Sequence, residues 1–85
     1  MYEIKTTTRF EKDLKLIKKR GYDTKLLKEV IDILSKGEKL EEKYKDHYLQ
    51  GNYSGFKECH IKPDWLLVYK IEDNVLVLTL SRTVV

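Results

Sequence analysis

The sequence predicts an α+β domain in which two helices pack as a hairpin on one face of a small, mostly antiparallel sheet. Two observations lead to this fold class. Apolar residues recur at helical spacing between residues 10 and 34, and from residue 52 onward they alternate with polar residues, as they do in strands. We expect the order β-α-α-β-β-β over one domain, residues 1–85, because a chain of this length can build a single core.

The N-terminal part predicts a strand followed by a helix. Residues 2–6 alternate apolar and polar side chains, which is typical of a short strand. Thr8 and Glu11 match a capping box at the start of a helix, and Gly21 is a suitable residue to end it. The helix has an apolar stripe at the expected spacing, formed by Phe10, Leu14 and Ile17.

A second helix is predicted after a short loop. Either Asp23 or Thr24 can act as its N-cap, and Gly37 is a natural end. One of its faces is apolar throughout, with Leu26, Leu27, Val30, Ile31 and Leu34. Because the loop between the two helices is short, they should form an antiparallel hairpin.

The remaining residues predict a loop and three strands. Residues 38–50 lack a clear period and are interpreted as a connecting loop that carries His47. The strands are expected at residues 52–61, 65–72 and 75–82. Asp73 and Asn74 should form the tight turn between the last two. We expect one face of the last strand to meet the helices through Leu76, Leu78 and Leu80.

Composition restricts the class of protein. Charged residues make up 36% of the chain and hydrophobic residues 41%, which indicates a globular rather than a disordered chain. The single cysteine, Cys59, cannot form an intramolecular disulfide and suits a reducing compartment. No stretch has the apolar length of a signal peptide or of a membrane span. We therefore expect a cytoplasmic protein with no membrane contact.

The net charge of +3 is unevenly distributed along the chain. Residues 1–20 carry seven Lys or Arg against three acidic residues, whereas residues 21–42 carry four against six. The first segment could meet a polyanionic partner, either nucleic acid or an acidic protein. On the charge count alone, a solvated helix face is the favoured interpretation.

The chemically reactive side chains concentrate in residues 43–69. This stretch holds both histidines, His47 and His60, with the single tryptophan, proline and cysteine. Histidine is the side chain that most readily gives and takes protons near neutral pH. With aspartates and lysines interleaved, the stretch suits a site that holds and cleaves a phosphodiester.

Each candidate residue also has a structural interpretation. His60 and Asp64 flank Lys62–Pro63, whose restricted backbone can hold them in a defined relation or simply form an exposed turn. Trp65 can stack on an unpaired base, although packing in the core is the favoured single role. Arg82 can bind phosphate oxygens or be an ordinary surface residue.

No metal site is expected from these residues. The available ligands would be the two histidines and Cys59, but Cys59 and His60 are adjacent on a strand and should point to opposite faces. Cys59 is interpreted as a small core residue.

Two segments resemble a known family: Tyr44 to Gly51, YKDHYLQG, and Glu58 to Tyr69, ECHIKPDWLLVY. In order and spacing they resemble the YKDHxLxG and HxxPDW-type segments of the YafQ-like branch of the RelE superfamily of type II toxin-antitoxin toxins. The resemblance implies a RelE-like fold and a ribosome-dependent mRNA endonuclease that cuts in the A site. It implies attack by the ribose 2′-OH without a metal or other cofactor. It also implies two partners, a cognate antitoxin protein and the ribosome.

The same resemblance implies roles for individual residues. His47, His60 and Asp64 would form the acid–base group, and which histidine is the general base stays open. Arg82 would stabilise the charge that builds on the phosphate. Substrate binding would be helped by Lys45, Lys62 and Trp65.

The C-terminus departs from the family pattern. Relatives usually continue with a Gly-x-His tail and an aromatic residue, whereas this sequence reads Val84-Val85 after Thr83. The resemblance therefore implies weakened cleavage, since a positioned acid contributes about 10²–10⁴-fold. One alternative is a homologue that binds antitoxin or ribosome without cutting. The other is an unrelated basic RNA-binding domain, which the two matched segments disfavour.

Overall fold

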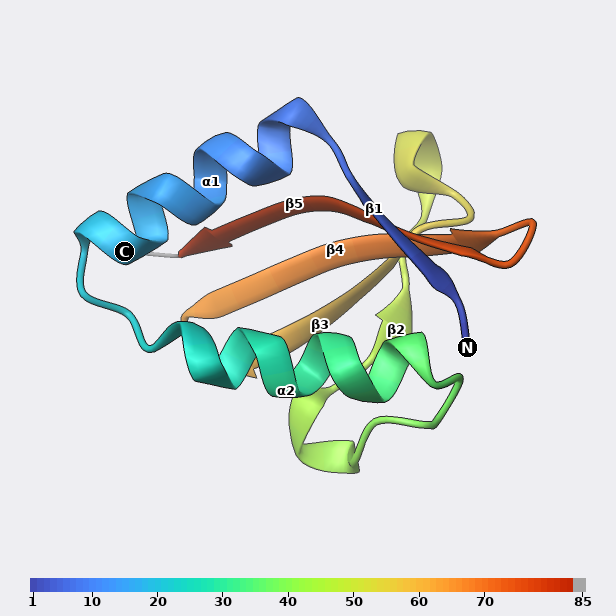
Figure 1. The fold of residues 1–85 in the computed structure, drawn as a ribbon. Helices are drawn as coiled ribbons and strands as arrows, with labels where there is room; N and C mark the ends of the chain where they lie inside the picture. The colour runs from blue at the N-terminus through green and yellow to red at the C-terminus, as the bar shows by residue number, and fades with distance from the viewer. Residues whose placement is uncertain (84–85) are drawn as a thin grey trace.

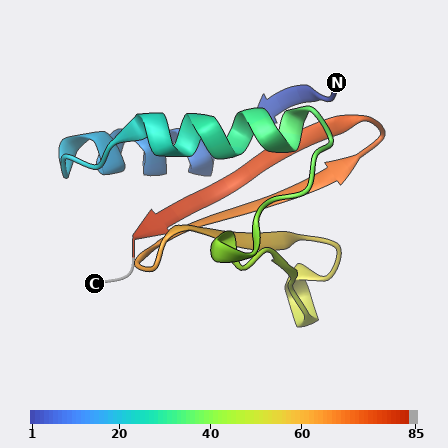
Figure 2. The same ribbon diagram turned by 90° about the horizontal axis from the view of Figure 1, so that it is seen from below.

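In the computed structural model, which describes residues 1–83, two helices lie on one face of a five-stranded sheet (Figure 1, Figure 2). The helices are α1 (Thr8–Lys19) and α2 (Thr24–Ser35). The strands are β1 (Glu3–Thr6), β2 (His47–Tyr48), β3 (Lys57–Lys62), β4 (Trp65–Glu72) and β5 (Val75–Thr83). Their order is β1-β5-β4-β3-β2, with β1 parallel to β5 and the other neighbouring pairs antiparallel. The predicted α+β class is confirmed.

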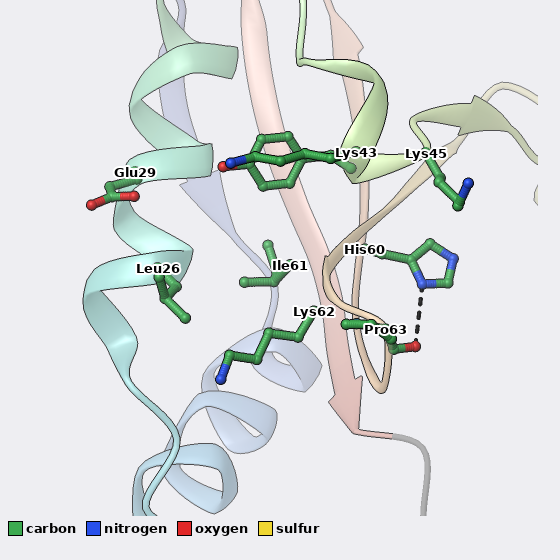
Figure 3. Close-up of a pocket in the computed structure, with 9 residues that line it drawn as sticks. Leu26, Glu29, Lys43, Lys45, His60, Ile61, Lys62 and Pro63 are labelled. Carbon is green, nitrogen blue, oxygen red and sulfur yellow. Dashed lines mark hydrogen bonds between the residues drawn. The ribbon is translucent and has the colours of Figure 1, made fainter.

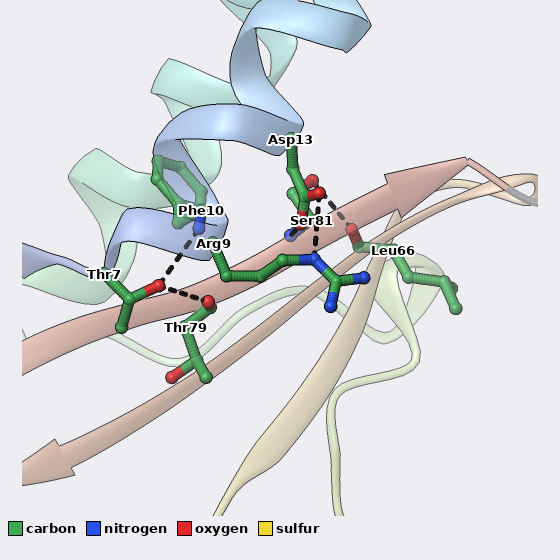
Figure 4. Close-up of polar contacts among 7 residues, drawn as sticks. All are labelled: Thr7, Arg9, Phe10, Asp13, Leu66, Thr79 and Ser81. Atoms are coloured by element: carbon green, nitrogen blue, oxygen red, sulfur yellow. Dashed lines mark hydrogen bonds and ion pairs between the residues drawn. The ribbon is translucent and has the colours of Figure 1, made fainter.

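The start of α1 differs by one residue from the prediction. Thr7, not Thr8, is the N-cap, and its hydroxyl accepts a hydrogen bond from the Phe10 amide at 3.0 Å (Figure 4). The same hydroxyl donates to the Thr79 carbonyl of β5, so Thr7 joins the helix start to the sheet. The predicted capping box is therefore wrong, because Glu11 lies one position too far along the helix to complete it. At α2, Asp23 is the N-cap and accepts from the Lys25 amide at 3.0 Å.

The core lies between the helices and the sheet face that they cover. The helices contribute Phe10, Ile17, Leu27, Val30 and Leu34, and the sheet contributes Cys59, Ile61, Trp65, Leu67, Tyr69, Leu76 and Leu78. Burial of large apolar side chains contributes about 1.5–3 kcal/mol each and dominates the stability. The apolar stripes predicted for both helices therefore face the sheet.

A β-bulge in β5 changes which side chains face the helices. Val68 pairs with Leu80 and Tyr69 pairs with Leu78, so Thr79 is an extra residue in the ladder. Beyond it the alternation of faces is inverted. Leu80 therefore lies on the face away from the helices, and the expectation that it meets them is wrong.

Ser81 takes the buried position that follows the bulge, with 1% of its surface exposed (Figure 4). Its hydroxyl accepts from Trp65 Nε1 at 2.9 Å and donates to the Leu66 carbonyl at 2.8 Å. Its amide donates to Asp13 of α1 at 3.0 Å. The bulge thus places a small polar residue where the core needs a hydrogen-bond partner for the tryptophan.

The segment before β3 is also more ordered than predicted. The expected loop over residues 38–50 contains a 3-10 turn, Glu42–Tyr44, and the two-residue strand β2. The expected strand from residue 52 begins only at Lys57, because Gly51–Tyr53 form a second 3-10 turn. The predicted turn at Asp73 and Asn74 is confirmed, with φ of 52° and 63°, as a type I′ hairpin requires. Within the described residues, neither helix has the length and apolar composition needed to cross a bilayer.

Candidate active site

The sheet face that the helices leave uncovered collects three of the seven predicted site residues, His47, His60 and Arg82. We call it the open face and define it by His47, Glu58, His60 and Arg82, with Leu66, Val68 and Leu80 as its apolar floor. In one row His47 pairs with Glu58, which pairs with Val68. In the next row His60 pairs with Leu66, which pairs with Arg82. His60 and Arg82 are thus two strands apart, about 10 Å between their backbones.

His47 has both ring nitrogens engaged. Its Nδ1 lies 2.7 Å from the Lys45 carbonyl oxygen, and its Nε2 lies 3.5 Å from Glu58 Oε1. A carbonyl can only accept, so Nδ1 carries the hydrogen and Nε2 of the neutral ring is free to take a proton. Glu58 is then placed to stabilise the imidazolium that forms. This is the arrangement expected of a general base with a carboxylate beside it.

His60 is held less firmly. Its Nδ1 lies 3.4 Å from the Pro63 carbonyl, which is a long and weak contact. In Figure 3 its ring points away from Leu26 and Ile61, toward the open face. Its side chain therefore keeps freedom to meet a ligand there.

Asp64 lies in the turn after β3, and its partner comes from the helices. The Tyr22 hydroxyl donates to Asp64 Oδ2 at 3.0 Å. This hydrogen bond to a carboxylate raises the pKa of Tyr22. The structure therefore directs Asp64 toward the connection between α1 and α2, and does not pair it with His47 or His60.

Trp65 occupies the core and has no exposed surface. Tyr22 packs edge-on against it, with ring centroids 5.3 Å apart and the planes at 74°. A ring in this position cannot stack on a base, so the structure contradicts the substrate-binding role expected for Trp65 and supports the core role.

The three cationic candidates fall into two hollows. Lys45 and Lys62 line a hollow of about 530 Å³ between α2 and the edge of β3, and His60 lines it with them (Figure 3). The other lining residues include Leu26, Glu29 and Ile61. Arg82 is exposed and lines a smaller hollow of about 170 Å³ on the open face. Its other lining residues are Leu49, Tyr53, Glu58, Val68 and Leu80. Arg82 and Glu58 therefore border the same space.

Three residues that contact or hold the predicted site residues were not among the predicted ones: Tyr22, Asp46 and Glu58. Glu58 carried a usable signal, because it lies two positions before His60 on a strand and must share its face. Asp46 lies beside His47 in the YKDHYLQG segment, but no partner for it could be read from the sequence. Tyr22 carried no signal, since its partner is distant in the sequence.

Among residues 1–83, no three His, Cys, Asp or Glu side chains are grouped as metal ligands. Cys59 faces the core with no exposed surface. Its burial raises the pKa of the thiol to about 12, so it is a neutral core residue at physiological pH.

The fold is shared with solved bacterial toxins. A metal-bound toxin from Helicobacter pylori matches with a TM-score of 0.92 and 46% identity, covering 98% of this chain and 94% of that one. The toxin in an Escherichia coli DinJ-YafQ complex matches with a TM-score of 0.89 and 36% identity, covering 98% and 93%. The mRNA interferase toxin YafQ of E. coli K12 is 39% identical over 75 residues, which are 87% of this chain and 82% of that protein.

The family match agrees with these structures. The family described as the bacterial toxin of type II toxin-antitoxin systems, YafQ, matches residues 2–84. The chain belongs to this YafQ toxin family, and the resemblance noted in the sequence is confirmed. The expectation about the C-terminal tail concerns positions from residue 84 onward, which lie outside the described residues.

Proposed function

We propose that this chain is an mRNA interferase that cuts messenger RNA in the ribosomal A site without a metal ion. The arrangement of His47 is the observation that carries the proposal. Its Nδ1–H is bonded to a carbonyl, a carboxylate stands at its Nε2, and His60 and Arg82 share its face. The E. coli relative that bears the name mRNA interferase supports the same activity.

In this mechanism His47 is the general base. Its Nε2 takes the proton of the ribose 2′-OH while the 2′ oxygen attacks the adjacent phosphorus. The carboxylate of Glu58, 3.5 Å from Nε2, stabilises the imidazolium. The P–O5′ bond breaks, and His60 in its protonated form gives a proton to the leaving oxygen. The products are a 2′,3′-cyclic phosphate and a 5′-OH.

The cations and Asp64 have supporting roles. The Arg82 guanidinium is a fixed fork of donors suited to the oxygens of the pentavalent phosphorane. Lys45 and Lys62 add weaker attraction for the RNA backbone. Asp64 remains a candidate member of the acid–base group, with Tyr22 as its hydrogen-bond partner.

The proposed partners are the ribosome and an antitoxin. E. coli YafQ forms a toxin-antitoxin complex with DinJ, and we expect this chain to bind an antitoxin of its own. On α1, the exposed Lys12, Lys15, Lys18 and Lys19 offer positive charge to ribosomal RNA or to an acidic protein.

The test uses translating ribosomes and an mRNA whose cut ends are mapped. We expect new 5′ ends in the A-site codon that carry a 5′-OH, and their loss when the attacking nucleotide lacks its 2′-OH. His47→Ala and Arg82→Ala should each lower the rate at least 100-fold. Glu72→Gln, which removes an exposed ion pair with Lys70, is the matched control and should cut normally. Ribosome binding without new ends would support the non-cutting alternative instead.

A further inference from the structure

His47 lies on a strand that is too short to hold it. Strand β2 consists of two residues, His47 and Tyr48, which pair with Glu58 and Lys57. Ladder hydrogen bonds over two residues give little rigidity. The proposed base nevertheless needs a fixed ring orientation, so other contacts must hold this segment.

Asp46, immediately before the strand, has both carboxylate oxygens engaged. The Tyr69 hydroxyl donates to Oδ1 at 2.6 Å, and Lys57 Nζ donates to Oδ2 at 2.7 Å. Tyr69 belongs to β4 and is 1% exposed, so this carboxylate reaches across β3 to the core. Burial and the bond to Asp46 raise the pKa of Tyr69, which keeps its hydroxyl a donor. Such short bonds to an ionised group are among the strongest in proteins.

The same lysine also holds the residue on the other side of His47. Lys57 Nζ lies 4.9 Å from the centroid of the Tyr48 ring, a cation–π contact. One amine thus links Asp46 and Tyr48, the two neighbours of His47 in the chain. Lys45 adopts a left-handed conformation with φ of 50°, and its carbonyl receives the His47 Nδ1–H.

We propose that Asp46 is a positioning residue for His47, acting through Tyr69 and Lys57. The contacts of Asp46 and Tyr48 with Tyr69 and Lys57 fix the backbone from Lys45 to Tyr48. The Lys45 carbonyl is thereby placed to accept the Nδ1–H of His47, which selects the tautomer whose Nε2 accepts a proton. Asp46 itself does not act on the substrate, because both of its oxygens are occupied on the side away from the open face. This inference rests on the proposed function, in which His47 is the general base.

The first test reads the tautomer directly and does not depend on activity. Nitrogen-15 NMR of the histidine rings should show His47 protonated at Nδ1 in the native protein near pH 8. We expect Asp46→Ala to shift this population toward the Nε2–H tautomer, and Glu72→Gln to leave it unchanged. A purely structural role would lower the melting temperature without moving the His47 signals. An unchanged tautomer in a folded Asp46→Ala protein would overturn the proposal.

The second test measures cleavage on ribosomes. Asp46→Ala should lower kcat about 10- to 100-fold with little change in KM, because misplacing a reacting group by 1 Å can cost about 100-fold. Lys57→Arg should retain most of the activity, and Lys57→Met should lose it, because only arginine restores the cation. In the His47→Ala background, Asp46→Ala should add no further loss, since the residue that it positions is gone. Additive losses would contradict the inference.

The two proposals fail separately. If the native protein does not cleave mRNA, the proposed function fails, but the tautomer measurement still decides whether Asp46 orients His47. If cleavage is normal in Asp46→Ala while His47→Ala is inactive, only the positioning role is overturned. If the Asp46→Ala variant does not fold, the same measurements are made on Asp46→Asn. This variant keeps the shape of the side chain and the hydrogen bond from the Tyr69 hydroxyl, but loses the charge that binds Lys57.

Discussion

Tyr22 and Asp64 are 42 positions apart in the sequence and are joined by a hydrogen bond of 3.0 Å from the hydroxyl to Oδ2. Tyr22 lies between α1 and α2, and Asp64 lies in the turn between β3 and β4. Tyr22 also packs edge-on against Trp65, the residue after Asp64. The helical hairpin therefore supports the turn that ends the strand carrying His60.

Removing this bond should affect activity more than stability. We expect Tyr22→Phe to reduce mRNA cleavage by about 3- to 10-fold with little change in the midpoint of urea unfolding, because an exposed hydrogen bond competes with water. Urea unfolding and cleavage rates check both parts. Tyr2→Phe, which removes a hydroxyl just before β1 at the opposite edge of the sheet from β2 and β3, is the control for loss of a hydroxyl. A large fall in the unfolding midpoint with normal cleavage would contradict the role of Tyr22 at the site.

Arg82 should be sensitive to its geometry as well as to its charge. Arg82→Lys keeps the positive charge beside Glu58 but loses the planar fork that matches phosphate oxygens. We expect cleavage to fall about 10-fold for lysine and about 100- to 1,000-fold for alanine. Because the side chain is exposed, the melting temperature should change by less than about 2 °C. Equal rates for the arginine and lysine proteins would show that only net charge matters.

The sequence was sufficient for the elements whose signals are local. The apolar stripes of both helices and the Asp73–Asn74 turn follow from spacing and from backbone preference. The cap of α1 was misplaced because Thr6, Thr7 and Thr8 are consecutive and chemically alike. Only the contact of Thr7 with β5 distinguishes them.

The candidate site was predictable only in part. The resemblance to the toxin family singled out His47, His60 and Arg82, which the sheet brings to one face. It included Asp46 but could not reveal that Asp46 binds Tyr69, and it gave no sign of Tyr22, because these contacts join remote elements. The bulge at Thr79 was also invisible, because threonine fits a regular strand as well as a bulged one.

Ser81 offers a test of that bulge. If β5 alternated regularly, position 81 would face away from the core and serine could be replaced freely. In the structure, Ser81→Ala leaves the Trp65 indole N–H and the Leu66 carbonyl without their partner. We expect a loss of about 2–6 kcal/mol in the free energy of unfolding, since each of the two buried unsatisfied groups costs about 1–3 kcal/mol. Thermal unfolding of Ser81→Ala measures this loss, and Ser54→Ala, which changes an exposed serine, is the control. Equal stability of the Ser81→Ala and native proteins would reject the bulged register.

Cys59 should make the stability fall at alkaline pH. Burial raises the pKa of the thiol from its ordinary value of 9.0 to about 12. Between these values the unfolded chain releases the thiol proton and the folded chain keeps it, so folding becomes less favourable as the pH rises. Below pH 9 the thiol does not affect the free energy of unfolding. Above pH 9 it lowers that free energy by about 1.4 kcal/mol per pH unit, a loss on the order of 3 kcal/mol at pH 11.

The comparison of native protein with Cys59→Ala isolates this effect, because every other titratable group is present in both proteins. At pH 7 the variant should be less stable, since it loses buried contacts made by the sulfur. As the pH rises from 9 to 11 the difference should shrink and then change sign, because only the native protein must keep a thiol neutral. Urea unfolding at pH 7, 9, 10 and 11 gives the four free energies. A difference that stays constant across this range would show that the thiol does not ionise differently in the folded and unfolded chains.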